Sequence, residues 1–459
     1  MEQITKPHCG ARLDRLPDCR WHSSMFAIVA FGLLVCWSNA VGGLILAQLK
    51  ALGWTDNSTT ATFSAITTAG MFLGALVGGI IGDKTGRRNA FILYEAIHIA
   101  SMVVGAFSPN MDFLIACRFV MGVGLGALLV TLFAGFTEYM PGRNRGTWSS
   151  RVSFIGNWSY PLCSLIAMGL TPLISAEWNW RVQLLIPAIL SLIATALAWR
   201  YFPESPRWLE SRGRYQEAEK VMRSIEEGVI RQTGKPLPPV VIADDGKAPQ
   251  AVPYSALLTG VLLKRVILGS CVLIAMNVVQ YTLINWLPTI FMTQGINLKD
   301  SIVLNTMSMF GAPFGIFIAM LVMDKIPRKT MGVGLLILIA VLGYIYSLQT
   351  SMLLITLIGF FLITFVYMYV CYASAVYVPE IWPTEAKLRG SGLANAVGRI
   401  SGIAAPYAVA VLLNSYGVTG VFILLGAVSI IVAIAIATIG IETKGVSVES
   451  LSIDAVANK

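Results

Sequence analysis

Twelve apolar runs, each long enough to cross a lipid bilayer as a helix, dominate the sequence. They lie near residues 25–47, 59–82, 90–107, 111–135, 147–172, 182–201, 264–288, 300–323, 330–348, 352–376, 391–413 and 419–440. Because a bilayer core offers no hydrogen-bond partners, each span must satisfy its own backbone, and a helix does so. With 56% hydrophobic and 12% charged residues, the chain is too apolar for a soluble domain. We therefore predict an all-α, polytopic membrane protein with twelve transmembrane helices.

A charged motif occurs at matched places in the two halves of the chain. Gly82-Asp-Lys-Thr-Gly-Arg-Arg88 follows the second run, and Met323-Asp-Lys-Ile-Pro-Arg-Lys329 follows the eighth run, 241 residues later. A second matched pair of motifs contains Glu138 and Glu380, each followed three residues later by a proline. This duplication predicts two six-helix bundles related by a pseudo-twofold axis.

The basic residues predict the orientation of the spans. With the N-terminus inside, 28 of the 33 Lys and Arg fall in cytoplasmic tails, loops and helix ends. We therefore predict that both termini are cytoplasmic. The predicted parts are a tail at 1–24, six-helix bundles at 25–201 and 264–440, a central cytoplasmic loop with an amphipathic helix at 202–263, and a tail at 441–459. The net charge of +9 is thus explained by basic residues on the cytoplasmic side of the membrane. No nucleic-acid partner is expected.

Patterns typical of enzymes and metal sites are missing from the sequence. The seven cysteines are scattered, and His8, His22 and His98 lack metal-ligand spacing. No nucleophile motif is present. We expect no enzymatic activity, no cofactor and no metal.

Several motifs resemble those of the major facilitator superfamily, within it the branch of sugar porters and metabolite:proton symporters. They are the tract 82–88, the string Pro203-Glu-Ser-Pro-Arg-Trp-Leu209 after the sixth run, and Glu442-Thr-Lys-Gly445 near the C-terminus. The chain is similar over its whole length to bacterial inner membrane metabolite transport proteins. The resemblance implies alternating access, in which two bundles rock about a site near the middle of the membrane.

Charged residues at the cytoplasmic helix ends are predicted to form a gate, through ion pairs between bundles. An acid there opposes the inside-positive bias, and the carboxylate of Asp83 suits a neighbouring helix N-terminus. For single Lys and Arg residues, solvated charges are the alternative interpretation. The predicted gate consists of Asp83, Arg87, Arg88, Glu138, Arg145, Glu204, Arg207, Asp324, Arg328, Glu380, Arg389 and Glu442.

Polar groups inside the runs predict a substrate site. Arg399 is placed near the centre of the eleventh span, and Arg118 matches an arginine of the related families. On the seventh run Asn277, Tyr281 and Asn285 repeat at i, i+4, i+8, although interhelical hydrogen bonding is an alternative role. The predicted substrate-binding residues are Asn39, Arg118, Asn157, Trp158, Asn277, Gln280, Tyr281, Asn285, Tyr372, Asn395 and Arg399.

The carrier of a coupled proton is less evident from the sequence. Ser38 stands where proton-coupled sugar porters have a first-helix aspartate, in the stretch Cys36-Trp-Ser-Asn-Ala-Val41. Glu95 and His98, spaced i,i+3 on the third run, are an alternative pair, since imidazole titrates near physiological pH. A packing contact within the bundle is the competing interpretation of this pair.

These observations favour a secondary transporter, active or facilitative, for a small polar metabolite in the bacterial inner membrane. Two arginines at bilayer depth favour an organic acid, with a sugar or polyol as the alternative. The stretch 156–161 lacks the glycine-proline pattern of drug antiporters, which favours uptake over efflux. An efflux antiporter of the same fold and a transporter-like ligand sensor without flux remain as alternatives. The expected partners are the substrate, a co-transported proton and the lipid bilayer, and the chain is expected to be monomeric.

Overall fold

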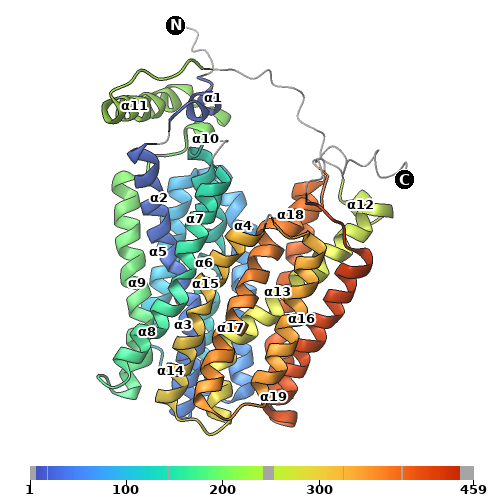
Figure 1. Ribbon diagram of the computed structural model, residues 1–459. Coiled ribbons are helices and arrows are strands. Elements are labelled where there is room, and N and C mark those ends of the chain that lie inside the picture. The colour runs from blue at the N-terminus through green and yellow to red at the C-terminus, as the bar shows by residue number, and fades with distance from the viewer. Residues whose placement is uncertain are drawn as a thin grey trace. The chain divides into compact units, whose positions relative to one another are not determined.

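A computed structural model describes residues 7–17, 19–141, 145–240, 253–323, 325–383 and 386–444. All regular elements in these residues are helices (Figure 1). They are α1 (Cys9–Asp14), α2 (Arg20–Gly32), η1 (Leu33–Cys36), α3 (Trp37–Ala51), α4 (Asn57–Thr85), α5 (Arg87–Ala106), α6 (Met111–Tyr139), α7 (Arg145–Asn157), α8 (Ser159–Leu170), α9 (Ala176–Tyr201), α10 (Pro206–Ser211), α11 (Tyr215–Thr233), α12 (Tyr254–Leu257), α13 (Gly260–Thr293), α14 (Leu298–Met309), α15 (Gly311–Val322), α16 (Arg328–Ser347), α17 (Met352–Val370), η2 (Cys371–Tyr377), α18 (Val378–Glu380) and α19 (Lys387–Ile439).

Ten helical segments in the described residues are long and apolar enough to cross a membrane. The chain is therefore an all-helical, multi-pass membrane protein. Several helices start at a side-chain cap. Asn110 accepts a hydrogen bond from the Phe113 backbone nitrogen at 2.9 Å, and Asn297 accepts one from Asp300 at the same distance. Each cap satisfies an amide that the first turn of a helix leaves without an internal partner.

Some predicted spans are not single regular helices. The 3₁₀ turn η1 interrupts the first span, and Trp158 separates α7 from α8 within the fifth. The eleventh and twelfth spans are joined in α19, which bends at Gly417, where φ is 64° and ψ is −159°. Glycine adopts this backbone conformation at little steric cost. The ten segments found by length and composition therefore differ in number from the twelve predicted runs.

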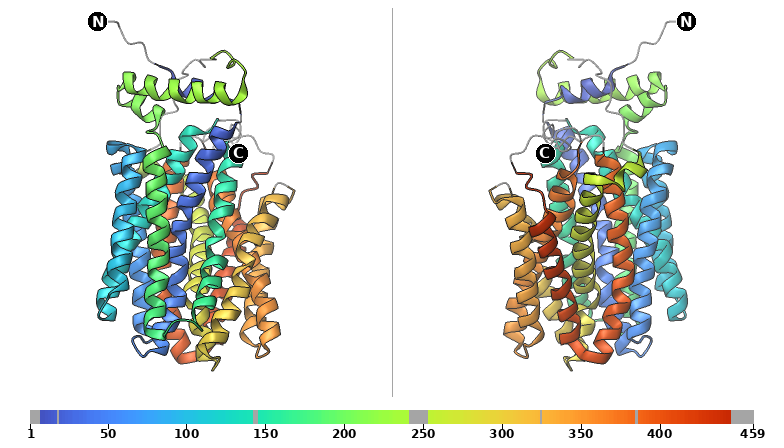
Figure 2. Two further views of the ribbon diagram at one scale, coloured as in Figure 1. Left: turned by 90° about the vertical axis from the view of Figure 1, so that its left-hand side faces the viewer. Right: turned by 90° about the vertical axis from the view of Figure 1, so that its right-hand side faces the viewer.

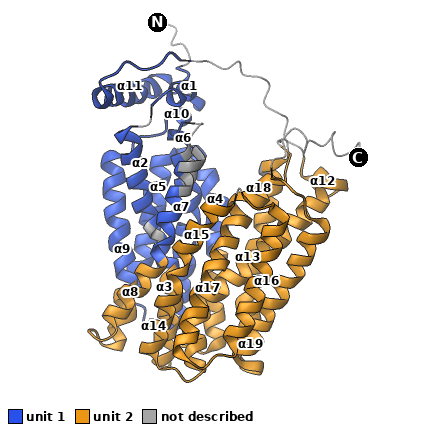
Figure 3. Ribbon diagram, in the orientation of Figure 1, with its two compact units in different colours: residues 1–39, 70–159, 184–246 blue, residues 40–69, 160–183, 247–459 orange. Residues whose placement is uncertain are grey.

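Contacts between Cα atoms divide the chain into two compact units (Figure 3). Unit 1 comprises residues 1–39, 70–159 and 184–246, and unit 2 comprises residues 40–69, 160–183 and 247–459. The units differ from the two predicted six-helix bundles, because parts of α3, α4, α8 and α9 from the first half of the chain belong to unit 2.

In unit 1, α5 packs against α6 around an apolar core that includes Phe91, Leu128 and Phe136. The amphipathic helix α11 runs across the ends of the longer unit 1 helices, with α1 beside it (Figure 2). Its buried face includes Met222 and Val229 and packs against apolar side chains of α1. Burial of this face holds α11 and α1 together by the hydrophobic effect.

In unit 2, α13 packs against α19, and α15 packs against α17. One core cluster joins Ala61 of α4 to Trp286 of α13 and Val409 of α19. The first turn of α4 also meets α19, because the Asn57 amide donates a hydrogen bond to the Asn414 side-chain oxygen at 2.5 Å. Residues 40–69, although they belong to the first half of the sequence, thus pack directly on helices of the second half.

Candidate functional site

A buried polar network surrounds Ser38 in unit 1. The 3₁₀ turn η1 ends just before this residue, and irregular helical turns of this kind often mark functional positions. Arg118 of α6, which is 2% exposed, donates a hydrogen bond through Nη1 to the Ser38 carbonyl oxygen at 2.7 Å. The hydroxyl of Ser38 lies 2.9 Å from Nε2 of His98 on α5. Arg118 and His98 therefore bind the same residue through different atoms.

His98 and Glu95 form the fully buried part of this network. Both side chains are 0% exposed, and His98 Nδ1 lies 3.7 Å from the Glu95 carboxylate. The same ring nitrogen lies 3.3 Å from the hydroxyl of Ser191 on α9. Helix α6 approaches closely here, since a Cβ on Gly124 would lie 3.1 Å from the His98 backbone nitrogen. Ser191 was not anticipated from the sequence, where it is one of many serines in apolar runs.

The predicted amides of α13 lie at contacts between helices. Asn277 is 4% exposed and donates a hydrogen bond to the Leu273 carbonyl of its own helix at 2.7 Å. Its amide nitrogen faces Gly398 of α19, where a Cβ would lie 3.0 Å away. Tyr281 packs in the same way against Gly402. Asn285 is 7% exposed, and Gln280 is half-buried.

The remaining predicted substrate residues differ widely in exposure. Asn39 is 7% exposed and Asn157, which donates to the Ser153 carbonyl at 2.8 Å, is half-buried, whereas Trp158 is 36% exposed. Tyr372 is fully buried, and its ring stacks on Tyr377 with centroids 5.0 Å apart.

On α19 two predicted residues lie one helical turn apart. Asn395 is exposed and donates to the Ser391 carbonyl at 2.9 Å. Arg399 is half-buried, and its Nη1 atom is buried with no hydrogen-bond partner among the described residues. A buried guanidinium nitrogen is costly without an acceptor, so this atom suits a ligand that brings a carboxylate or another oxygen.

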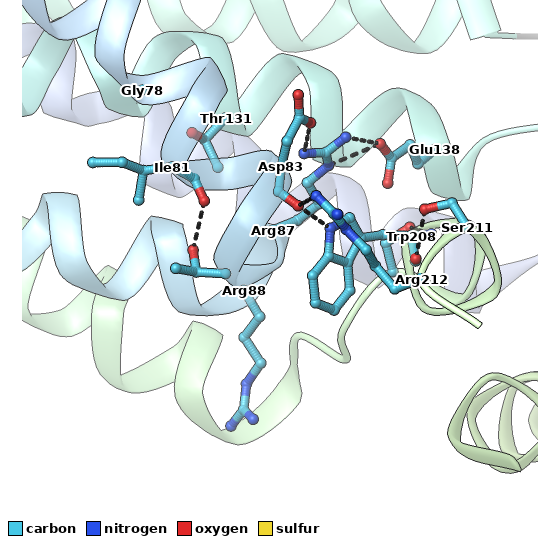
Figure 4. A network of polar contacts seen from close by, with 12 residues as sticks. Gly78, Ile81, Asp83, Arg87, Arg88, Thr131, Glu138, Trp208, Ser211 and Arg212 are labelled. Atoms are coloured by element: carbon cyan, nitrogen blue, oxygen red, sulfur yellow. Dashed lines mark hydrogen bonds and ion pairs between the residues drawn. The ribbon is translucent and has the colours of Figure 1, made fainter. Parts of the chain in front are cut away.

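In unit 1 Asp83, Arg87 and Glu138 of the predicted gate form one network (Figure 4). Arg87 at the start of α5 donates to Asp83 at 2.7 Å and lies 2.8 Å from Glu138 of α6. Glu204 accepts hydrogen bonds from the backbone nitrogens of Arg87 at 2.7 Å and Arg88 at 3.3 Å. A carboxylate at this place satisfies free amides and the positive end of the α5 dipole.

Helix α10 is tied to the same network through the backbone of Asp83. Trp208 Nε1 donates to the Asp83 carbonyl oxygen at 2.7 Å, and Arg212 donates to the same oxygen (Figure 4). Neither contact was predicted from the sequence, although Trp208 stands inside the recognised string 203–209. Arg88 extends away from this cluster to the Trp199 carbonyl, and Arg207 pairs with Asp14 of α1 at 3.0 Å.

Unit 2 contains a matching network. Arg328 at the start of α16 lies 3.0 Å from Glu380, and Glu442 accepts hydrogen bonds from the backbone nitrogens of Arg328 at 2.8 Å and Lys329 at 3.1 Å. Thr443 adds a hydrogen bond to Glu380 at 2.6 Å. Burial acts to raise the pKa of Glu442, but the backbone amides of Arg328 and its neighbours outweigh it and lower that pKa.

A pair of tyrosines repeats between the two networks. Tyr139 donates to the Pro203 carbonyl and Tyr377 donates to the Ile441 carbonyl, each across 64 residues of sequence. This equal spacing is a signal of the duplication that the motifs alone did not reveal.

The side chains of two predicted gate residues are not described, and a third gate residue contacts an aromatic ring rather than a carboxylate. Asp324 lies outside the described residues, and the side chain of Arg145 is likewise not described. Arg389 lies over the ring of Tyr254, 5.3 Å from its centroid. The described ion pairs of the gate therefore join residues within one unit: Arg87 with Asp83 and Glu138, Arg207 with Asp14, and Arg328 with Glu380.

Comparisons with known proteins agree with these features. The profile of the Major Facilitator Superfamily matches residues 25–406. The inner membrane metabolite transport protein YdjE of Escherichia coli (strain K12) is 44% identical over 455 residues, which cover 98% of this chain and 99% of YdjE. The niacin transporter NiaP of Acinetobacter baylyi is 26% identical over 448 residues, covering 96% of this chain and 99% of NiaP.

Solved structures show the same fold. The xylose transporter XylE from E. coli, in a partially occluded inward-open conformation, matches with a TM-score of 0.73 at 18% identity. The match covers 93% of this chain and 100% of the XylE chain.

Proposed function

The chain belongs to the major facilitator superfamily, and on that premise we propose that it is a secondary transporter that takes up a small polar metabolite by alternating access. The fold and the relatives support transport of a small metabolite. The proposed location is the bacterial inner membrane, as for the inner membrane transport protein YdjE.

The proposed topology has twelve spans in a 6+6 arrangement, with both termini cytoplasmic. Helices α7 and α8 together supply the fifth span, and α19 supplies the last two, which turn back at Gly417. Adding the fifth span and dividing α19 takes the ten segments found by length and composition to twelve. The distribution of Lys and Arg supports cytoplasmic termini.

We propose that the substrate carries an anionic group, as an organic acid does. The single observation that carries this proposal is the buried Nη1 atom of Arg399, which has no hydrogen-bond partner among the described residues. A carboxylate would supply the acceptor that this atom lacks, and arginine binds carboxylates with two parallel hydrogen bonds. NiaP, whose name gives niacin as its cargo, is a relative for which a carboxylic acid is the substrate.

Other predicted residues complete the proposed site. Asn395 lies one turn from Arg399 on the same helix, where its amide can donate to an oxygen of the substrate. Asn277, Gln280, Tyr281 and Asn285 of α13, with Tyr372 of η2, are proposed contacts for the rest of the substrate within unit 2. Asn39, Arg118, Asn157 and Trp158 of unit 1 stay predicted substrate residues. Those that are buried at helix contacts require a helix movement before a ligand can reach them, which alternating access provides.

A ligand screen followed by flux tests this function. Purified full-length protein is heated with carboxylates, sugars and polyols at equal concentrations, since a ligand that binds the folded state raises the melting temperature. We expect carboxylates, nicotinate among them, to stabilise the wild type, and Arg399→Gln to abolish that stabilisation. Hits are then tested for uptake into proteoliposomes. Stabilisation by sugars alone, or by carboxylates equally in Arg399→Gln, would refute the anionic substrate, and binding without flux would identify a sensor.

A further inference from the structure

Two ionisable side chains that the substrate site does not use are buried together in unit 1. Glu95 and His98 lie on one face of α5, are both 0% exposed, and approach to 3.7 Å. An ionised carboxylate isolated in such a place is costly, whereas a carboxylate beside a protonated imidazole, or a carboxylic acid beside a neutral one, is electrically neutral. The pair is therefore suited to hold one proton.

Ser38 connects this pair to the rest of the protein. The Ser38 hydroxyl lies 2.9 Å from His98 Nε2. The hydroxyl can therefore pass its proton to the imidazole ring while its oxygen accepts another proton. The carbonyl oxygen of Ser38 accepts the hydrogen bond from Arg118 at 2.7 Å. One residue of the first span thus touches both the proposed proton site and the arginine at bilayer depth.

Ser38, which contacts His98, also contacts the charged side chain of Arg118. Helix α5 contributes Glu95, α6 contributes Arg118, and α3 and α9 contribute the hydroxyls of Ser38 and Ser191. When the pair has lost its proton, its net charge is −1, and the positive charge of Arg118 compensates it. When the pair holds the proton it is neutral and no longer repels a substrate anion.

We propose that Glu95 and His98 are the proton-coupling site of this transporter, loaded through Ser38, so that proton uptake and anion binding favour each other. The proposal rests on the function proposed above for the substrate anion, but the proton site itself can be tested without a substrate. Loading adds one proton to the pair, and unloading returns it along the same path. Thermodynamic reciprocity then requires that a bound anion also increases proton affinity.

The first experiment observes His98 directly in the full-length protein. The chain has three histidines, so nitrogen-15 labelling of histidine followed by NMR in detergent gives three imidazole signal sets. The set that disappears in His98→Gln belongs to His98. We expect its ring nitrogens to change between the charged and the neutral pattern as the pH is varied over the range in which the protein stays folded, because the proposed site takes up and releases one proton. We also expect Glu95→Gln to change the pH at which this happens.

One control variant and one further test variant accompany this measurement. Ser101→Ala removes a hydroxyl that donates to the His98 backbone carbonyl at 2.8 Å, so it changes the same helix without touching the ring and should leave the titration unchanged. Ser38→Ala should alter the signal of Nε2. If His98 in the wild type keeps one pattern across this pH range, or if Glu95→Gln leaves its titration unchanged, the proposal is refuted even where substrate transport has been demonstrated.

A second measurement links the site to transport. Proteoliposomes with an alkaline interior are supplied with a carboxylate found in the thermal screen. We expect the wild type and Ser101→Ala to accumulate it above equilibrium, and His98→Gln and Ser38→Ala to lose accumulation while retaining exchange of labelled for unlabelled substrate. Full accumulation by His98→Gln would overturn the proposal. If no screened compound is transported, the substrate proposal fails while the NMR titration still decides the proton site.

Discussion

Glu204 accepts a hydrogen bond from the backbone nitrogen of Arg87 at 2.7 Å, across 117 residues of sequence. The carboxylate thereby caps the first turn of α5, just after Gly86, whose φ of 98° and lack of a Cβ leave room for the Glu204 side chain. In unit 2 Glu442 caps α16 in the same way through Arg328. The duplicated loops are thus each followed by a helix that a distant carboxylate of the same unit caps.

Removal of this cap should destabilise the protein. Glu204 accepts from three backbone amides, those of Arg87, Arg88 and Ser205, and hydrogen bonds to a charged group are each worth roughly 1.5–3 kcal/mol. We expect Glu204→Ala to lower the apparent melting temperature in detergent clearly, and Glu442→Ala to do so as well. Glu217→Ala is the matched control, because its pair with Arg214 is largely exposed and surface pairs contribute little. Equal losses in all three variants would contradict the capping role.

The cap also illustrates what could be predicted from the sequence. The apolar runs and the repeated tracts located the helices and the charged residues at their ends, because these signals are local or duplicated. The individual pairs, Arg87 with Glu138 and Arg328 with Glu380, were not predicted, since the sequence analysis expected ion pairs between bundles. The role of Glu204 could not be predicted, since a cap supplied from 117 residues away depends on how the helices pack.

Two further features illustrate the same limit. Gly156 and Pro161 flank the break at Trp158 between α7 and α8, but membrane helices tolerate both residue types, so the apolar run 147–172 is predicted as one span. The N-terminal tail was predicted only as cytoplasmic, yet its residues 9–14 form a helix held to α11 by apolar contacts and ion pairs. Such a contact between two short amphipathic segments leaves no periodic signal that identifies the partner.

Asp83→Asn should abolish uptake and leave membrane insertion intact. The Asp83 side chain is 65% exposed and its ion pair with Arg87 therefore contributes little stability. Its proposed role lies in closing the cytoplasmic gate, where loss of the charge removes an electrostatic contact that only one conformation makes. Uptake of a screened substrate and size-exclusion chromatography of the tagged protein measure the two properties. Lys84→Gln, next to it in the same loop, is the control, and normal uptake by Asp83→Asn would remove this residue from the gate.

The contact between α1 and α11 should open in acid. Arg12 pairs with Glu226 at 2.7 Å and also with Glu219, while Arg15 pairs with Glu226 at 2.6 Å. Burial acts to raise the pKa of Glu226, but the hydrogen bonds from Arg12 and Arg15 outweigh it and lower that pKa below its usual value. A lowered carboxylate pKa contributes stability above the unfolded value, near pH 4.5, and that stability is lost as the pH falls further.

Cys9, which is 0% exposed on α1, reports this opening. In a variant that keeps Cys9 as its single cysteine, we expect reaction with dithiodipyridine to be slow at pH 7 and faster below about pH 4.5, relative to unfolded protein at the same pH. Arg12→Ala should accelerate the reaction at pH 7 by about tenfold or more, since 1.4 kcal/mol is one factor of ten. Arg223→Ala, whose pair with Glu219 involves a 71% exposed arginine, should have little effect. A rate for Arg12→Ala equal to the wild type would show that the apolar face alone holds α1.

The hydrogen bond between Asn57 of α4 and Asn414 of α19 joins the two halves of the sequence inside unit 2. Under the proposed topology both residues lie at the extracellular ends of their helices, so alternating access requires this contact to break in each cycle. In a background without other cysteines, Asn57→Cys with Asn414→Cys should form a disulfide on oxidation, because the native side chains approach to 2.5 Å. A protease site inserted after Gly234 separates the halves, which then migrate together only when cross-linked. We expect the cross-link to stop uptake and reduction to restore it, with each single variant insensitive to oxidant. Full uptake by the completely cross-linked protein would show that the ends of α4 and α19 do not separate during transport.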